Sequence, residues 1–371
     1  MRRRRIGWEW WLAPWLLAAL PGCGLSYLAH VSRGQLEILW NRKPIAEVLA
    51  DPALDPQVRA KLEVVGRARE LARDIGLTAG ESYQSYVALD RPFASIALSA
   101  APKDRLEPYV WHFPIVGNVP YKGFFDRALA EEERAALAAD GYDTYLREVD
   151  AYSTLGWFAD PVLSPMLQRS EASLVDTIVH ESTHATIFEK GNADFNEGLA
   201  TFVGGEGAIL YLVRTKGADS PEAKALAARL ADQERFTAFL KELFADLDAY
   251  YAGPASPTDK VAGRDARMAE WQDRLRGADV GLFKRYAEIP WNNAFLLSLK
   301  LYLVDLGRFR RLHEGLGGDI AATVRFLKDD PSGDSASKRL DAWLASHPEV
   351  PPDRPGPPPA SPPAPPADPA V

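Results

Sequence analysis

Apolar residues recur every three or four positions over most of the chain and alternate with polar ones over a shorter part of its N-terminal half. From Ser26 to about Gly76 the spacing predicts helices, with Gly76 as a helix end. The runs at 83–89, 93–100 and 109–117 alternate or are rich in β-branched and aromatic residues, which predicts strands. The turn sequence "DRP" between the first two runs favours a small antiparallel sheet.

The rest of the pattern is mostly helical. A charged amphipathic helix is predicted at 124–141 and a strand at 142–149. Residues 151–167 are irregular and aromatic and contain two prolines, which is typical of a loop, either structural or functional. Helices are then expected from about 170 to 345, with breaks near residues 255 and 290. The predicted fold class is therefore α+β, predominantly helical.

Composition and charge exclude some classes of protein. The content is that of an ordinary globular protein, 47% hydrophobic and 25% charged. The net charge of −8, with no basic stripe after the first residues, argues against a nucleic-acid partner. The single cysteine, Cys23, excludes an internal disulfide and a four-cysteine zinc site.

The N-terminus has the pattern of an exported protein. Arg2 to Arg5 precede an apolar run from Trp10 to Leu20, which describes a secretory signal or an uncleaved amphipathic anchor. The sequence "LPGC" resembles the bacterial lipobox, which implies a lipidated Cys23 as the first mature residue. Cleavage there would remove four arginines and Glu9 and change the formal charge from −8 to −11. Such a body is expected to be held at the membrane by its lipid, not by basic residues.

These signals predict four segments. Residues 1–22 form a lipoprotein signal peptide, and 23–165 form an N-terminal helical segment with the small sheet. Residues 166–345 form a helical region, which the motifs described next make a candidate zinc-metallopeptidase region, and 346–371 form a proline-rich disordered tail. The expected location is the bacterial cell envelope, facing the periplasm; Gly24 after Cys23 lacks the aspartate associated with inner-membrane retention and so favours the outer membrane.

The metallopeptidase interpretation begins with "HESTH" at 180–184. His180 and His184 are four apart, so on a helix they share a face and both imidazoles can reach one zinc ion at about 2.0–2.1 Å. Glu181 lies off this pair but beside the metal, where it could take a proton from a water molecule. Two solvent-facing histidines on a surface helix would explain the same period, but not the apolar positions around them.

A catalytic zinc ion needs a third protein ligand. Glu197 in "NADFNEGLATF" can return to the metal if Gly191 and Asn192 turn the chain into a second helix. The alternative is local, because Asp194 and Glu197 also have the spacing of a capping box at a helix start.

The two motifs together resemble the gluzincin metallopeptidases, and in particular the zinc aminopeptidases related to thermolysin. The resemblance implies a gluzincin-like catalytic domain with a small antiparallel sheet packed near the helix that carries H-E-x-x-H. It assigns the third ligand to the glutamate of Asn196-Glu197-Gly198-Leu199-Ala200. The gap between His184 and Glu197 is shorter than in the alanyl and leucyl aminopeptidases, and the chain has no G-x-M-E-N segment.

A resemblance to a bacterial family of aminopeptidase lipoproteins covers nearly the whole chain. It rests on the lipobox and on "GQLEILWNRKPI", "FPIVGNVPYKGFFD", "AYSTLGWFADPVLS", "HESTHATIF" and "NNAFLLSLKLY". It implies a membrane-anchored peptidase with one zinc ion per chain and a peptide substrate. A zinc endopeptidase, a cell-wall peptide hydrolase and a catalytically inactive lipoprotein scaffold stay open as alternatives.

Other polar residues have weaker signals. In the resembling enzymes a downstream tyrosine or histidine stabilises the oxyanion, and the candidate for this role here is Tyr286. Tyr286 could equally be an ordinary tyrosine packed in the core. Tyr250 and Tyr251 stay open as further candidates. Asn292 and Asn293 are expected to cap a helix or, alternatively, to contact substrate. Asp176 or Thr201 could support a zinc histidine by a hydrogen bond to its ring. His112 is expected to be a strand residue, and the surroundings of His313 and His347 indicate no metal site.

Overall fold

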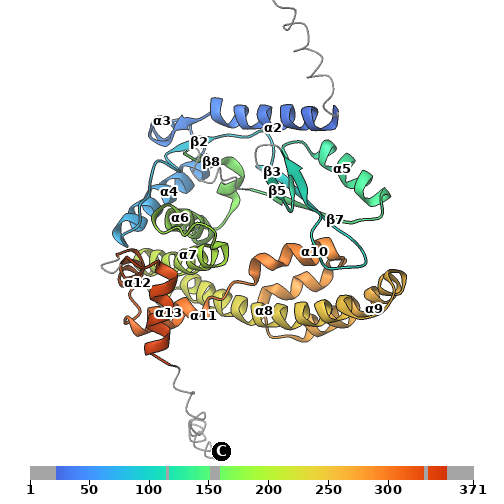
Figure 1. Ribbon diagram of the computed structural model, residues 1–371. Helices are drawn as coiled ribbons and strands as arrows, with labels where there is room; N and C mark the ends of the chain where they lie inside the picture. The colour runs from blue at the N-terminus through green and yellow to red at the C-terminus, as the bar shows by residue number, and fades with distance from the viewer. Residues whose placement is uncertain (1–21, 114–116, 151–158, 330–332, 349–371) are drawn as a thin grey trace, which may run out of the picture.

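The computed structural model describes residues 22–113, 117–150, 159–329 and 333–348, which form an α+β fold that is mostly helical (Figure 1). The helices are α2 (Gly22–Trp40), α3 (Ile45–Ala50), α4 (Pro56–Asp74), α5 (Arg127–Ala139), α6 (Glu171–Thr186), α7 (Ala193–Lys216), α8 (Pro221–Ala252), α9 (Pro257–Gly277), α10 (Asn293–Ser298), α11 (Gly307–Gly315), α12 (Ile320–Lys328) and α13 (Ala336–Ser346). Short 3₁₀ helices are η2 (Ser164–Gln168), η3 (Gly281–Glu288) and η4 (Leu299–Tyr302). The strands are β1 (Lys43–Pro44), β2 (Ser85–Val87), β3 (Ser95–Ala101), β4 (Trp111–Phe113), β5 (Gly117–Val119), β6 (Lys122–Phe124), β7 (Asp143–Val149) and β8 (Val162–Leu163).

The helices follow the predicted pattern, and their ends have clear local causes. Asp55 caps α4 by accepting hydrogen bonds from the backbone of Gln57 and Val58. Gly76 follows that helix with φ +92°, the left-handed conformation that glycine adopts without steric cost. The predicted breaks near residues 255 and 290 are confirmed, since α8 ends at Ala252 and η3 ends just before α10.

The predicted runs contain β2, β3, β4, β7 and the start of β5, whereas β1, β6 and β8 form where no strand was predicted. The pairing of the strands also differs from the expected single sheet. β2 and β3 do not pair with each other: β2 lies between β1 and β8, and β3 lies between β6 and β7. The β6-β3-β7 sheet is antiparallel, and β4 and β5 form a separate hairpin. The β2–β8 pair is parallel, so the sheet that shares its core with α6 is mixed rather than antiparallel. The sequence "DRP" indicated a turn between β2 and β3 but not which strands pair, because strand pairing depends on contacts between residues distant in sequence.

Three apolar clusters hold these elements together. The first combines α4, α6, α7 and α11 to α13 with β2 and β8, and the second combines α8, α9, η3 and α10. The third lies between the β6-β3-β7 sheet and α5. The first cluster contains residues from both sides of position 165. The boundary between the N-terminal segment and the helical region, which the sequence places at 165, stays a prediction.

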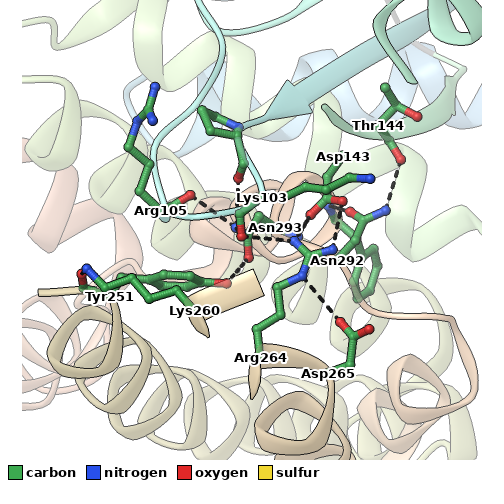
Figure 2. A network of polar contacts seen from close by, with 12 residues as sticks. Lys103, Arg105, Asp143, Thr144, Tyr251, Lys260, Arg264, Asp265, Asn292 and Asn293 are labelled. Atoms are coloured by element: carbon green, nitrogen blue, oxygen red, sulfur yellow. Dashed lines mark hydrogen bonds and ion pairs between the residues drawn. The ribbon is translucent and has the colours of Figure 1, made fainter. Parts of the chain in front are cut away.

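A buried polar network joins the second cluster to the sheet (Figure 2). The guanidinium of Arg264 on α9 makes a two-pronged ion pair with Asp143 at the start of β7. Asn293 donates its backbone N–H to the same carboxylate and its side-chain amide to the backbone oxygens of Pro102 and Arg105. The neighbouring Asn292 caps α10 and also donates to the Thr144 oxygen, so both asparagines have structural roles.

Several predicted features lie outside the described residues. These are positions 1–21 of the signal peptide, 151–158 of the irregular loop and 349–371 of the proline-rich tail. Within the part of the chain that the structure describes, no helix combines the length and the apolar character needed to cross a bilayer.

Candidate metal centre

The two histidines of the motif lie on α6. Ser170 caps this helix by accepting the Ser173 N–H, and the apolar side chains of Leu174 and Ile178 are fully buried in the first cluster. His180 and His184 follow on one face, and their Nε2 atoms are 3.1 Å apart. Because both ring nitrogens point to one place, the histidines form a pair and are not two independent surface side chains.

A tight turn returns the chain to this pair. α6 ends at Thr186, and Gly191 adopts φ +82° just before α7 begins. The amide of Asn196 holds the turn to α7, since its Oδ1 accepts the Glu189 N–H at 2.9 Å and its Nδ2 donates to the Glu189 oxygen at 2.8 Å. Asn196 therefore fixes the position of the next residue, Glu197.

The side chain of Glu197 faces the histidines. Its two carboxylate oxygens lie 3.6 Å from Nε2 of His180 and 3.4 Å from Nε2 of His184. The capping box that sequence left open does not form, because α7 starts at Ala193 with Asn192 as the N-cap, so Asp194 already lies inside the first turn. The two imidazoles lower the pKa of the Glu197 carboxyl well below its usual range.

The donor set fits a tetrahedral zinc ion. Ligands at about 2.0–2.1 Å from zinc are separated from one another by about 3.3–3.4 Å. The two Nε2 atoms are 3.1 Å apart, one Glu197 oxygen lies 3.6 Å from His180 and the other lies 3.4 Å from His184. One donor atom from each residue lies within 4.8 Å of the other two, and within the described residues this is the cluster that could hold a metal ion. Two nitrogens and one carboxylate leave a fourth position for water, and the Glu197 side chain is 58% exposed.

Glycines on α7 allow the two helices to approach closely enough for this geometry. A Cβ atom at Gly204 would lie 2.6 Å from Oδ1 of Asp176 and 3.2 Å from Cβ of His180. At Gly207 it would lie 2.9 Å from Val179, and at Gly198 it would lie 2.8 Å from the ring of Phe309 on α11. The separation of α6 and α7, and hence the distance from Glu197 to the histidines, depends on Gly204 and Gly207, whereas Gly198 allows α11 to approach α7.

Acidic groups surround the two imidazoles. Burial acts to lower the pKa of His180, but nearby carboxylates, led by Glu197, outweigh it and raise that pKa. Burial raises the pKa of Glu181, and the carboxylates of Asp160 and Glu197 reinforce the shift while the two imidazoles oppose it. A bound divalent cation would act in the opposite direction, because its charge favours ionised carboxylates.

The residues expected to support the histidines have different positions. Asp176 lies one turn before His180, where burial raises the pKa of its carboxyl. Thr201 lies one turn after Glu197 and lines a groove instead. Nδ1 of His184 is buried without a hydrogen-bond partner among the described residues, so neither side chain holds this ring by that atom.

Tyr286 packs away from α6 and α7. Its ring stacks on Phe236 with centroids 5.6 Å apart, in the second cluster, which contains no residue of either helix. Tyr250 donates its hydroxyl to the Lys260 oxygen and Tyr251 donates to Asn293, so both belong to the structural network. In the structure Tyr286 is therefore a packed core tyrosine, which was the alternative to an oxyanion-stabilising role.

The structure adds Tyr83, which sequence reasoning read only as a strand residue. The residue is buried, and its φ of +61° is unusual for a side chain with a Cβ atom. Burial raises the pKa of its phenol well above the usual value, and the charges of Glu181 and Asp160 add to this effect. The backbone N–H of Tyr83 donates to the Asp160 oxygen at 2.6 Å, and no spacing in the sequence connects these two residues.

Three other histidines, His112, His313 and His347, have local structural partners. His112 lies on β4 with Nδ1 2.6 Å from the Asn118 side chain, in agreement with the strand prediction. His313 is buried beside the Thr323 hydroxyl, and His347 stacks on Trp343 with ring centroids 4.2 Å apart.

A groove of about 710 Å³ begins at the third candidate ligand. It runs between α7, the segment from η4 to α11, and α13, which lie side by side in Figure 1. Its lining residues are Asn192, Asp194, Phe195, Glu197, Thr201, Lys300, Leu303, Val304, Asp305, Arg308, Phe309, Ser337 and Asp341. The apolar floor and charged rim could hold a short peptide beside the metal position.

The comparisons with known proteins give one family. A family model described as "Putative aminopeptidase" matches residues 26–339, which is most of the 371-residue chain. The chain belongs to this family. Membership implies a peptidase that acts on a peptide substrate. Neither the curated proteins nor the solved structures include a match.

Proposed function

We propose that the protein is a zinc aminopeptidase tethered to a bacterial membrane through a lipidated Cys23. The observation that carries the catalytic part is the convergence of His180, His184 and Glu197 on one point. The family match supports aminopeptidase activity, and the groove beside Glu197 supports a peptide ligand. The tether rests on the charged start, the apolar run and the lipobox-like "LPGC".

In this proposal the chain's own residues move the protons. A zinc ion held by the three side chains would acidify a water molecule and polarise the scissile carbonyl. Glu181 takes a proton from the attacking water and later delivers it to the departing amine. Burial raises the pKa of the Glu181 carboxyl, which favours taking up a proton, whereas the charge of a bound zinc ion would favour releasing it.

The function is tested by metal analysis and peptide assays on the same purified chain. We expect about one zinc ion per chain, and loss of peptide hydrolysis when a chelator removes it, with recovery when zinc is returned. Peptides with a free N-terminus should be cleaved one residue at a time, whereas the same peptides with an acetylated N-terminus should be resistant.

Each alternative has a distinct outcome in these assays. Cleavage of acetylated peptides would show that the protein is an endopeptidase and not an aminopeptidase. Release of fragments from cell-wall peptides alone would indicate a cell-wall hydrolase. A zinc-loaded chain that cleaves no member of a broad peptide library would indicate the inactive scaffold.

The helix spacing can be tested separately through Gly204→Ala. The added Cβ would clash with Asp176 and crowd His180, so α6 and α7 must separate. We expect a destabilisation of about 1–3 kcal/mol and weaker zinc binding, measured by urea unfolding and by competition with a chromogenic chelator.

The matched control is Gly66→Ala on α4, where a Cβ atom would have no neighbour within 4 Å. This change is expected to stabilise the helix by about 0.5–1 kcal/mol and to leave zinc affinity unchanged. Unaltered zinc binding in Gly204→Ala would show that the approach of the helices does not set the ligand geometry.

A further inference from the structure

The orientation of α2 on the body is fixed by its inner face. Ile38 is buried, and the Tyr27 hydroxyl donates to the Gly123 oxygen at 2.9 Å. Gly34 lies against the ring of Phe125, where a Cβ atom would come within 2.2 Å of the ring. Since α2 therefore cannot turn about its axis without losing these contacts, its opposite face points permanently away from the body.

That opposite face carries two large apolar side chains. Leu36 is 50% exposed and Trp40 is 82% exposed, and they lie one turn apart. Among the large apolar side chains that are exposed in the described part of the chain, these are the two that come from one helix. Arg33 beside them and Lys43 just after the helix are also exposed. The face combines an aliphatic and an indole side chain with flanking cations.

We propose that this outer face of α2 lies in the interfacial region of a lipid bilayer. Tryptophan prefers the boundary between headgroups and acyl chains, leucine enters the apolar side of that boundary, and lysine and arginine reach out to the headgroups. The contact depends on apolar side chains and needs no large positive patch, so it agrees with the acidic body of the protein. This inference rests on the proposed membrane tether through Cys23 and adds a second contact with the membrane.

The position of Cys23 indicates that a bilayer, and not another protein, covers the outer face of α2. The apolar run ends at Leu20, and Cys23 is the second residue of α2. At 1.5 Å per residue, Leu36 and Trp40 lie about 20 and 26 Å further along the helix axis. A lipid on Cys23 would bring the start of the helix to the membrane, and the two exposed side chains would then hold the rest of the helix flat on it.

Figure 1 shows the consequence for the whole molecule. α2 runs along one edge, while α8 and α9 run along the opposite edge. Docking through α2 would thus turn α8 and α9 away from the membrane and give the protein one fixed orientation, where a lipid anchor alone would allow it to tumble.

The test uses the full-length lipidated chain in vesicles of phosphatidylethanolamine and phosphatidylglycerol. With its single native cysteine acylated, Leu36→Cys provides one thiol for a nitroxide label. We expect the label to lose most of its collisions with a water-soluble relaxation agent and to gain collisions with oxygen dissolved in the membrane. The control is a label at Leu282→Cys, a 72% exposed position on η3, which packs on α8 and α9. It should behave as in water.

Each other outcome is decisive. A label at residue 36 that is as accessible to the aqueous agent as the label at residue 282 overturns the proposal. Spin–spin broadening that persists in detergent without lipid would identify a second copy of the chain as the occupant, and also overturns it. If the tether itself fails, Cys23 will take up a second label and the chain will not float with the vesicles. Adding Trp40→Ala should move the label at residue 36 towards water.

Discussion

Glu181→Gln is expected to leave about one zinc ion bound per chain and to reduce kcat by about 10²–10⁴-fold. Glutamine keeps the size and polarity of the side chain but cannot accept and deliver a proton. The metal ligands are His180, His184 and Glu197 in our proposal, so the change does not remove a donor. Peptide hydrolysis and zinc content are to be measured on the same preparation.

The control for this variant is Glu171→Gln, in the first turn of the same helix. It removes a carboxylate from α6 without touching the metal centre and should retain full activity. A Glu181→Gln protein that binds zinc, melts at the usual temperature and still hydrolyses peptides at the normal rate would remove Glu181 from the proposed mechanism.

Asp143→Ala is expected to destabilise the fold by about 3–5 kcal/mol, because it removes the buried carboxylate that pairs with Arg264 and leaves this guanidinium beside the exposed Asp265. Asp143 is 6% exposed and Arg264 is 8% exposed, and the same carboxylate also accepts the backbone N–H of Asn293. The loss is to be measured as the free energy of unfolding in urea.

The contrasting pair is Arg274 and Glu242, whose side chains are 53% and 66% exposed. Glu242→Ala should cost less than about 1 kcal/mol, because solvent screens an exposed ion pair. Equal effects of the two substitutions would mean that the buried network of Figure 2 does not link α9 to the sheet energetically.

The sequence predicted the features that depend on near neighbours. Apolar spacing gave most of the helices and the longer strands, β3 and β7, since each of these shows its own period, whereas the short strands β1, β6 and β8 were not predicted. The four-residue spacing put the two imidazoles on one face of α6. Gly191 and Asn192 indicated the turn that brings Glu197 back, and the 3.4–3.6 Å distances show that the turn does so. The role of these three side chains as zinc ligands stays a prediction.

Features that depend on distant residues could not be predicted. Strand pairing was wrong because the alternation in β2 and β3 says which face is buried but not which strand lies alongside. Tyr286 follows a break in the helices, yet its surroundings are set by Phe236, fifty positions earlier. Tyr83 is buried in an unusual backbone conformation, for which a single sequence carries no periodic signal.

The candidate ligands all come from one pair of consecutive helices, and this has a consequence for the order of folding. His180 and Glu197 are separated by a short loop, whereas Asp143 and Arg264 are 121 residues apart. Closing a short loop costs little chain entropy, and local contacts form before distant ones. The helical hairpin of α6 and α7 can therefore gather its donors at an early stage of assembly, while the junction between α9 and the sheet must await the closure of a much longer loop.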